Sequence, residues 1–324
     1  MPFMSNHSRI VYFDFMRSFC AIWIIGLWHM PNYMAPNIAA KFVNHFGWQT
    51  TFCVLATFAF ISGFFGANNQ IATRDDVLDY YKKRMLRIYP LYAIASITLV
   101  ICQYNSWESL PLYLIGLGSF LKPYPATIWF VSMLLIFYFI TPLLLKCSAK
   151  NAFVFSAIIE IIFLVLAFLV ESDIRLAYYW PFYFLGLIFK RNNLNLKFFE
   201  GHRNWGCIVI TFSSYFIIGM KSGNNFTIVT FICCLLFIYS VMNIFERLSK
   251  LVHFNRAISY ISYSSMCAYL FHRPIFYIIK IIVGEFEPVV AFLIYLPCVF
   301  ILGGVFQRTY DKLIFRNRSK ACAF

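Results

Sequence analysis

An arginine and a histidine lie inside the first long apolar segment of the chain. Arg17 and His29 fall within RSFCAIWIIGLWHM, which is otherwise long and hydrophobic enough to form a membrane-spanning helix. An ionisable side chain inside hydrocarbon costs roughly 3 kcal/mol or more, so it is expected mainly at a functional site. The two residues are about 18 Å apart along an ideal α-helix. This spacing places Arg17 near one rim of the membrane and His29 deeper, which suits an enzyme that holds an anionic donor at one face and reacts further in.

His29 is the leading candidate for a general base. A neutral histidine in a dry pocket can take the proton of a hydroxyl because its ordinary pKa lies near the working pH. The alternative is a histidine that only bonds a neighbouring backbone carbonyl or hydroxyl. His272 and Arg273 in AYLFHRPIF form a second ionisable pair, which we expect to share a cavity with His29. Arg273 is explained equally well by substrate binding and by a side chain that reaches toward the membrane surface.

Arginines are also candidates for phosphate binding. Arg17, Arg84 and Arg87 are predicted on the same side of the membrane, with Lys82 and Lys83 beside them. A guanidinium fork suits a phosphate group. The alternative is contact with lipid headgroups, since basic loops are ordinary on the cytoplasmic face. Asp14 precedes Arg17 by three residues, so the pair can form a local ion pair that lowers the cost of burying both.

The remaining polar candidates give weaker signals. Glu160 is isolated in apolar sequence, either protonated and hydrogen-bonded or paired with a cation of another helix. Ser62 precedes Gly63, which permits close approach of two helices. The ten cysteines are scattered without C-x-x-C spacing, so they are interpreted as packing residues and no metal site is predicted.

The elements that must position these residues are membrane helices. The chain is 61% hydrophobic and only 12% charged, far below the charged fraction of a soluble domain. We predict one all-α domain over residues 1–324, a polytopic bundle whose first span is retained rather than cleaved. Ten candidate spans cover residues 10–32, 47–66, 88–106, 127–146, 152–170, 178–190, 205–220, 226–245, 258–280 and 289–307.

Charge placement predicts the orientation of this bundle. With the N-terminus inside, 21 Lys and Arg residues fall on the cytoplasmic side and six on the other, so both termini are predicted to be cytoplasmic. The net charge of +14 therefore reflects topology and membrane lipids as partners rather than nucleic acid. The inner loop 67–87 is predicted to form an interfacial helix that starts near Asp75 and Asp76 and runs into the third span, which Pro90 opens. The outer loop 107–126 is predicted to be a short amphipathic or re-entrant piece.

The ordered motifs resemble the acyltransferase family 3 membrane proteins, which O-acylate sugars and other acceptors. The matching segments follow the family's order over nearly the whole chain: FDFMRSF leading to Trp28-His29, FISGFF, YKKRMLRIYPLY, TIWFVSMLLIFYFITP and YLFHRPIF. The resemblance also agrees with a ten-span bundle. No single segment is specific, whereas the ordered set is.

The resemblance implies that His29 is catalytic and that Arg17, Arg84 and Arg87 bind the phosphates of an acyl-CoA, most often acetyl-CoA. It further implies a co-substrate rather than a permanently bound cofactor, a glycan or lipid-linked glycan acceptor reached from the non-cytoplasmic side, and a home in the inner membrane of bacteria. His29 would deprotonate a sugar hydroxyl for direct attack on the thioester. A covalent acyl-histidine intermediate is the alternative.

Two departures from the family pattern bear on the site. Eleven residues separate Arg17 from His29, where the family usually has ten, and one extra residue turns His29 by about 100° on an ideal helix. Either a π-bulge absorbs this residue or Arg17 reaches around the helix. Many members also carry Glu about five residues after the tryptophan that corresponds to Trp129. Here Leu134 and Leu135 stand at that place, so no carboxylate there can orient the histidine.

A non-catalytic transporter or flippase of a glycolipid or small anion is the competing hypothesis, because proton-coupled transporters also use buried His and Arg. The absence of an internal inverted repeat in the sequence counts against transport. Acetyl-CoA dependence in inside-out membrane vesicles separates the two hypotheses, because a transporter would not show it.

Overall fold

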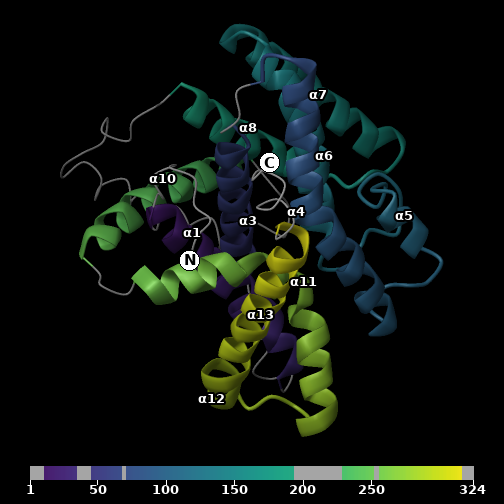
Figure 1. Ribbon diagram of the computed structural model, residues 1–324, viewed down its shortest axis with the longest axis vertical. Helices are drawn as coiled ribbons and strands as arrows, with labels where there is room; N and C mark the ends of the chain where they lie inside the picture. Colours follow the sequence, from purple (N-terminus) through teal and green to yellow (C-terminus); the bar gives the residue numbers. More distant parts are fainter. Residues whose placement is uncertain (1–10, 35–44, 68–70, 193–227, 252–254, 316–324) are drawn as a thin grey trace, which may run out of the picture.

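The computed structural model describes residues 11–34, 45–67, 71–192, 228–251 and 255–315, and these residues form a bundle of helices (Figure 1). Within them β-pairing is limited to one isolated bridge between Met34 and Phe286. The elements in chain order are α1 (Val11–Ile22), η1 (Trp23–His29), η2 (Met30–Tyr33), α3 (His45–Gly66), α4 (Arg74–Ile101), α5 (Leu110–Leu114), α6 (Trp129–Lys146), α7 (Ala149–Leu169), α8 (Arg175–Arg191), α10 (Ile228–Leu251), α11 (Asn255–Val283), α12 (Pro288–Val290), η4 (Ala291–Tyr295) and α13 (Leu296–Phe315).

The predicted membrane bundle is confirmed: the described residues include eight helical segments long and apolar enough to span a bilayer. These eight include the continuous run Val11–Tyr33 through α1, η1 and η2. The predicted span 178–190 corresponds to α8, which has 17 residues. The predicted span 205–220 and both chain termini lie outside the described residues, so the count of ten and the cytoplasmic termini remain predictions.

The predicted interfacial helix and third span are a single helix. α4 starts after Thr73, whose side chain accepts from the backbone N–H of Asp76 while the Asp76 carboxylate accepts from the backbone N–H of Thr73. This reciprocal capping satisfies two donors at the helix start and explains the start near Asp75. The interfacial helix therefore runs into the third span as predicted, although Pro90 lies inside α4 rather than at the start of a span. The helix is about 42 Å long and carries its basic first half directly into the membrane.

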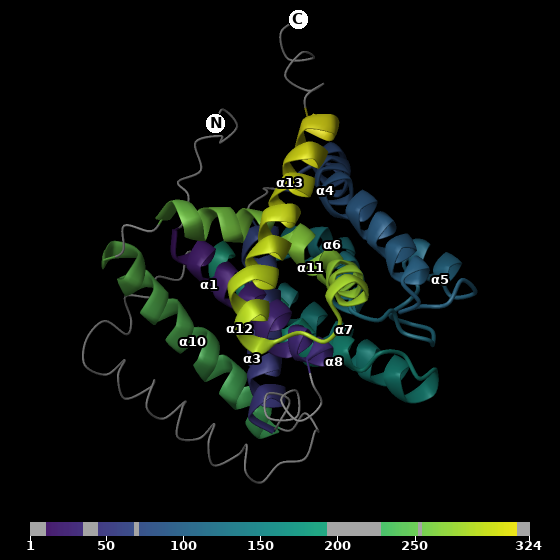
Figure 2. The ribbon, with the colours of Figure 1, turned by 90° about the horizontal axis from the view of Figure 1, so that it is seen from below.

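Helix α3 is the central element of the described bundle and contacts α1, α6, α8 and α10 (Figures 1 and 2). It crosses α8 at two glycines. A Cβ on Gly63 would lie 1.9 Å from the carbonyl oxygen of Tyr183, and one on Gly186 would lie 2.0 Å from that of Phe60. Both positions therefore require glycine, which confirms the close helix approach predicted at Gly63.

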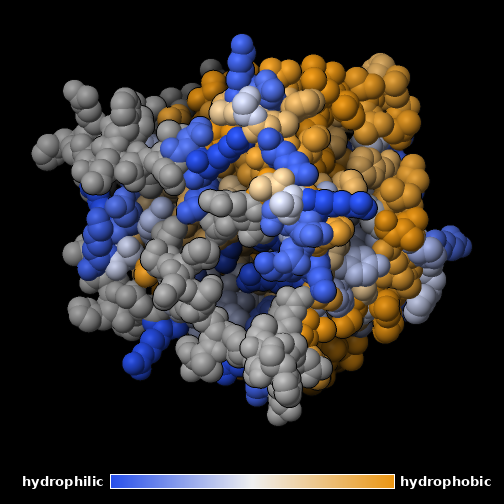
Figure 3. Space-filling view, turned by 45° about the horizontal axis from the view of Figure 1, so that its top comes forward, coloured by the Kyte–Doolittle hydropathy of each residue, from blue (hydrophilic) through white to orange (hydrophobic). Residues whose placement is uncertain are grey.

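The outer wall of the bundle is apolar. Residues on α7 such as Phe168 and Ile161 expose 85% and 59% of their surface, far more than core residues of a soluble protein would. Figure 3 shows hydrophobic residues covering the side wall, while hydrophilic residues gather on the face turned toward the viewer. This distribution is typical of a protein surrounded by lipid.

Candidate active site

A π-helical segment carries His29 into the site. Residues Trp23–His29 form η1, directly continuing α1, and the backbone N–H of Met30 bonds to the carbonyl of Ile25 with the i→i+5 spacing of a π-helix. Each such turn takes in one more residue than an α-helical turn. Of the two ways to accommodate the extra residue between Arg17 and His29, the structure therefore contains the π-helix.

His29, His272 and Arg273 come together, as predicted from their positions in the first and ninth spans. Nη2 of Arg273 lies 2.9 Å from Nδ1 of His29. The two imidazole rings lie 4.9 Å apart between centroids. His272 is completely buried, whereas His29 is half-buried. Nδ1 of His272 lies 2.6 Å from the carbonyl oxygen of Tyr269 one turn earlier on α11. Two histidines and a guanidinium thus form one cluster, referred to below as the histidine cluster (His29, His272 and Arg273).

Tyr104 covers the guanidinium of this cluster and is itself hydrogen-bonded to a second tyrosine. Arg273 lies over the ring of Tyr104 at 5.4 Å from its centroid. The hydroxyl of Tyr104 is 2.5 Å from that of Tyr33, which belongs to η2 just beyond His29. The segment after α4, the segment after η1 and helix α11 therefore meet at the histidine cluster. All three come from the end of the bundle opposite the start of α4.

Buried polar atoms without a partner concentrate around the same cluster. Among the described residues, seven buried side-chain nitrogen or oxygen atoms have no hydrogen bond, and four of them belong to Asn105, Thr127, His272 and Arg273. Hydrogen bonds link them through neighbouring residues, because Ala126 precedes Thr127 and Tyr269 also contacts His272. Oδ1 of Asn105 accepts from the backbone N–H of Ala126, and the hydroxyl of Tyr269 donates to the carbonyl of Thr127. Unpartnered buried polar atoms are rare in native proteins, and such a concentration is typical of a ligand site.

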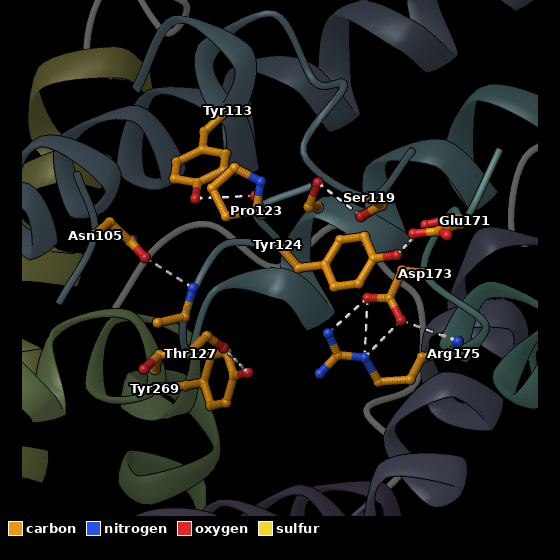
Figure 4. A network of polar contacts seen from close by, with 12 residues as sticks. Asn105, Tyr113, Ser119, Pro123, Tyr124, Thr127, Glu171, Asp173, Arg175 and Tyr269 are labelled. Carbon is orange, nitrogen blue, oxygen red and sulfur yellow. Dashed lines mark hydrogen bonds and ion pairs between the residues drawn. The ribbon is translucent and has the colours of Figure 1, made fainter. Parts of the chain in front are cut away.

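Trp129 lies behind this region and is covered on one face by Arg175, whose guanidinium carbon is 3.8 Å from the ring centroid. Asp173 holds that guanidinium with both carboxylate oxygens, at 2.7 and 2.9 Å from Nε (Figure 4). In the described contacts, Trp129 is thus covered by Arg175, which Asp173 holds in place.

An exposed ion pair connects the loop between α5 and α6 to the segment between α7 and α8. Lys122 donates to Glu171, and the hydroxyl of Tyr124 donates to the carbonyl of Glu171. The hydrogen bond from Lys122 lowers the pKa of the Glu171 carboxyl and raises that of Lys122 itself. These contacts fix the loop from α5 to α6 against the start of α8, and with it the position of Thr127.

Two of the predicted phosphate-binding arginines, Arg17 and Arg84, meet at Phe65 at the end of α3. The guanidinium carbon of Arg17 is 4.5 Å from the Phe65 ring centroid, and Nη2 of Arg84 donates to the Phe65 carbonyl. Arg84 also lies over Tyr138 at 4.9 Å. The charges of Arg84 and Arg87 act on Arg17 at short range. The structure therefore brings the three arginines together, which we call the arginine cluster (Arg17, Arg84 and Arg87).

Three other predicted candidates have different surroundings. Asp14 accepts a 2.7 Å hydrogen bond from Ser262, which joins α1 to α11, and its charge also acts on Arg17. Ser62 lies half-buried beside the α3–α8 crossing. Glu160 is on α7, where its Oε2 has no hydrogen-bond partner among the described residues. The described contacts place none of these three against the histidine cluster.

Sequence reasoning missed Tyr33, Tyr104, Asn105 and Thr127. A tyrosine or asparagine after an apolar segment is an ordinary interfacial residue, so its type carries no signal. Thr127 adopts a φ of 67°, which is a genuine outlier for a β-branched residue and visible only in the backbone.

Comparison with known proteins identifies the family. A model of an acyltransferase domain family, acyltransferase family 3, matches residues 10–308, nearly the whole chain. No curated protein and no solved structure matches the chain. Since the match spans both clusters and every described helix up to the last turns of α13, the chain belongs to acyltransferase family 3 of the membrane acyltransferases.

Proposed function

We propose that the chain transfers an acetyl or other short acyl group from cytoplasmic acyl-CoA to a hydroxyl of a surface glycan or its lipid-linked precursor, in the inner membrane of a bacterium. The observation that carries the proposal is the separation of two clusters on one set of helices. The arginine cluster lies at the middle of α1, the first half of α4 and the end of α3, and the histidine cluster lies beyond the end of α1.

The arginine cluster supplies the donor site. Three guanidinium groups that repel one another at close range are stabilised by an anion placed among them. The phosphates of acyl-CoA provide this charge, and the pantetheine arm would extend along η1 toward His29. Neither step requires a permanently bound cofactor or a metal ion.

The histidine cluster supplies the reaction site. The unpartnered atoms near it include amide N–H donors on Asn105, a guanidinium N–H on Arg273 and a hydroxyl on Thr127. A hydroxyl acceptor, which both donates and accepts hydrogen bonds, matches such a mixed set. His29 takes the hydroxyl proton as the oxygen attacks the thioester carbonyl. The alternative course, an acyl-histidine intermediate on His29, gives the same products.

The test uses inside-out membrane vesicles that are formed with the host's surface glycan in their lumen, with radiolabelled acetyl-CoA added outside. We expect label in the glycan with the wild-type protein and a loss of about 100- to 10,000-fold with His29→Ala, the usual range for a lost general base. Ser62→Ala is the matched control, since it changes a half-buried polar residue of α3 and should keep full transfer. Wild-type vesicles that move glycolipid or an anion without consuming acetyl-CoA would contradict the proposal in favour of transport.

A further inference from the structure

The hydrogen bond between Arg273 and His29 fixes which nitrogen of His29 carries the proton. A guanidinium has N–H donors and no acceptor, so Nδ1 of His29, 2.9 Å from Nη2, must be the acceptor. A neutral imidazole with its lone pair on Nδ1 carries its proton on Nε2. The basic atom of His29 is therefore Nδ1, and Arg273 covers it.

A carboxylate in the place of Arg273 would impose the opposite arrangement, because it accepts N–H from Nδ1 and leaves the lone pair on Nε2. Arg273 therefore orients His29 by donating a hydrogen bond to Nδ1, whereas a carboxylate would accept one from it. The consequence is chemical: His29 cannot accept a proton at Nδ1 while the guanidinium occupies its lone pair.

Arg273 itself is free to change partners. Its Nε is buried without a hydrogen bond, and no ion pair found among the described residues involves it. Its other close contact is the face of Tyr104. A partly buried cation held by a neutral nitrogen and an aromatic face gains interaction energy when an oxygen anion becomes available nearby.

We propose that Arg273 is a catalytic residue that caps Nδ1 of His29 in the resting site and moves to the thioester oxygen when the substrates bind. The proposal rests on the proposed acyl transfer. The acceptor O–H bond breaks with its proton going to the uncovered Nδ1, the oxygen forms a bond to the thioester carbon, and the carbonyl π pair becomes an oxyanion held by the guanidinium. Collapse of this intermediate breaks the C–S bond, and the CoA thiolate takes the proton from His29.

His272 is placed to support the protonated state of His29. Its Nδ1 donates to the carbonyl of Tyr269, so its Nε2 carries a lone pair, and this Nε2 has no partner among the described residues. The ring lies beside that of His29, at 4.9 Å between centroids. When His29 holds protons on both nitrogens, its Nε2–H gains an acceptor of suitable polarity in His272.

The tautomer is measured directly by nitrogen-15 NMR on membranes that contain protein labelled at its histidines, with His29→Gln identifying the His29 signals. We expect an unprotonated Nδ1 and a protonated Nε2 for His29 in the wild type. In Arg273→Met this single state should give way to a mixture of tautomers, whereas Arg308→Met should leave it unchanged. Arg308 is the matched control because it also lies over a tyrosine, Tyr260 at 5.3 Å, on α13. A protonated Nδ1 in the wild type would overturn the proposal.

Kinetics test the second role. Loss of one donor to an oxyanion lowers kcat by about 100- to 1,000-fold. We expect this loss in Arg273→Met with an unchanged KM for acetyl-CoA, and a smaller loss in Arg273→Lys, which keeps the charge. An Arg273→Met protein that folds and retains its kcat overturns the oxyanion role. A wild type that consumes no acetyl-CoA would instead refute acyl transfer, while the tautomer measurement still tests the cap.

Discussion

Replacing Arg17 by methionine tests whether the arginine cluster binds the phosphates of the donor. The Arg17 guanidinium stacks on Phe65 at 4.5 Å, and a methionine can keep this apolar contact while removing the charge and the N–H donors. The substitution also removes repulsion, because the charges of Arg84 and Arg87 act on Arg17. We therefore expect Arg17→Met to fold with a melting temperature close to that of the wild type.

The magnitude follows from the lost contact. A hydrogen bond to a charged group contributes about 1.5–3 kcal/mol, which corresponds to an increase in KM for acetyl-CoA of about 10- to 150-fold. kcat should change little, because the arginine cluster lies at the end of α3 and the histidine cluster lies beyond the end of α1. The KM of Arg17→Lys should lie between those of the wild type and Arg17→Met, since lysine keeps the charge and loses the two-pronged guanidinium fork.

The assay compares acetyl-CoA with S-acetylpantetheine, which carries the same thioester without phosphates. If Arg17 contacts phosphate, the wild type prefers acetyl-CoA, and Arg17→Met loses most of this preference while using S-acetylpantetheine as well as the wild type does. An equal loss of kcat/KM on both donors would show that Arg17 acts on the thioester or on the fold. An unchanged kcat/KM on both donors would show that Arg17 is not part of the donor site.

Two further predictions concern the parts of the fold that hold the sites. Gly63→Ala should lower the free energy of unfolding by about 1–3 kcal/mol, because its Cβ would lie 1.9 Å from the Tyr183 carbonyl oxygen. Its melting temperature should therefore fall, whereas that of Ser62→Ala should equal the wild-type value. Equal melting temperatures of the two variants would contradict the close crossing of α3 and α8. Asp173→Asn should lower the free energy of unfolding by about 1–3 kcal/mol, because it weakens the hydrogen bonds to Arg175. The KM for acetyl-CoA should not change; a changed KM would show that Asp173 and Arg175 affect binding of the acyl donor.

The sequence predicted Arg17 and the histidine cluster because ionisable side chains in apolar sequence are conspicuous, whereas Arg84 and Arg87 were candidates as basic residues of the interfacial helix. Arg17, His29, His272 and Arg273 all stand inside membrane segments, where each is costly and calls for a function or a partner. The meeting of the first and ninth spans was expected from the depths of their histidines, and the described contacts confirm it. The partners of Asp14 were harder to foresee, since Ser262 is 248 residues away.

Helix boundaries were predicted less well than helix existence. Pro90 was taken as the start of a span, yet α4 runs through it, because the capping of Thr73 and Asp76 starts the helix earlier and packing holds the later turns. Proline inside a helix loses one backbone hydrogen bond, a local cost that tertiary contacts can offset. Sequence alone contains no measure of those contacts.

The sequence by itself determined that the chain is a helical membrane protein, which ionisable residues its membrane helices carry, and in what order. These follow from composition and from the cost of charge in hydrocarbon, both of which are local properties. Only the tertiary structure decided that the segment before His29 is π-helical, that Arg273 donates to Nδ1 of His29, and that unpartnered atoms of Asn105 and Thr127 lie near the same site. The reason is physical: a tautomer, a ring's orientation and an unfilled hydrogen bond each depend on atoms brought together from distant helices.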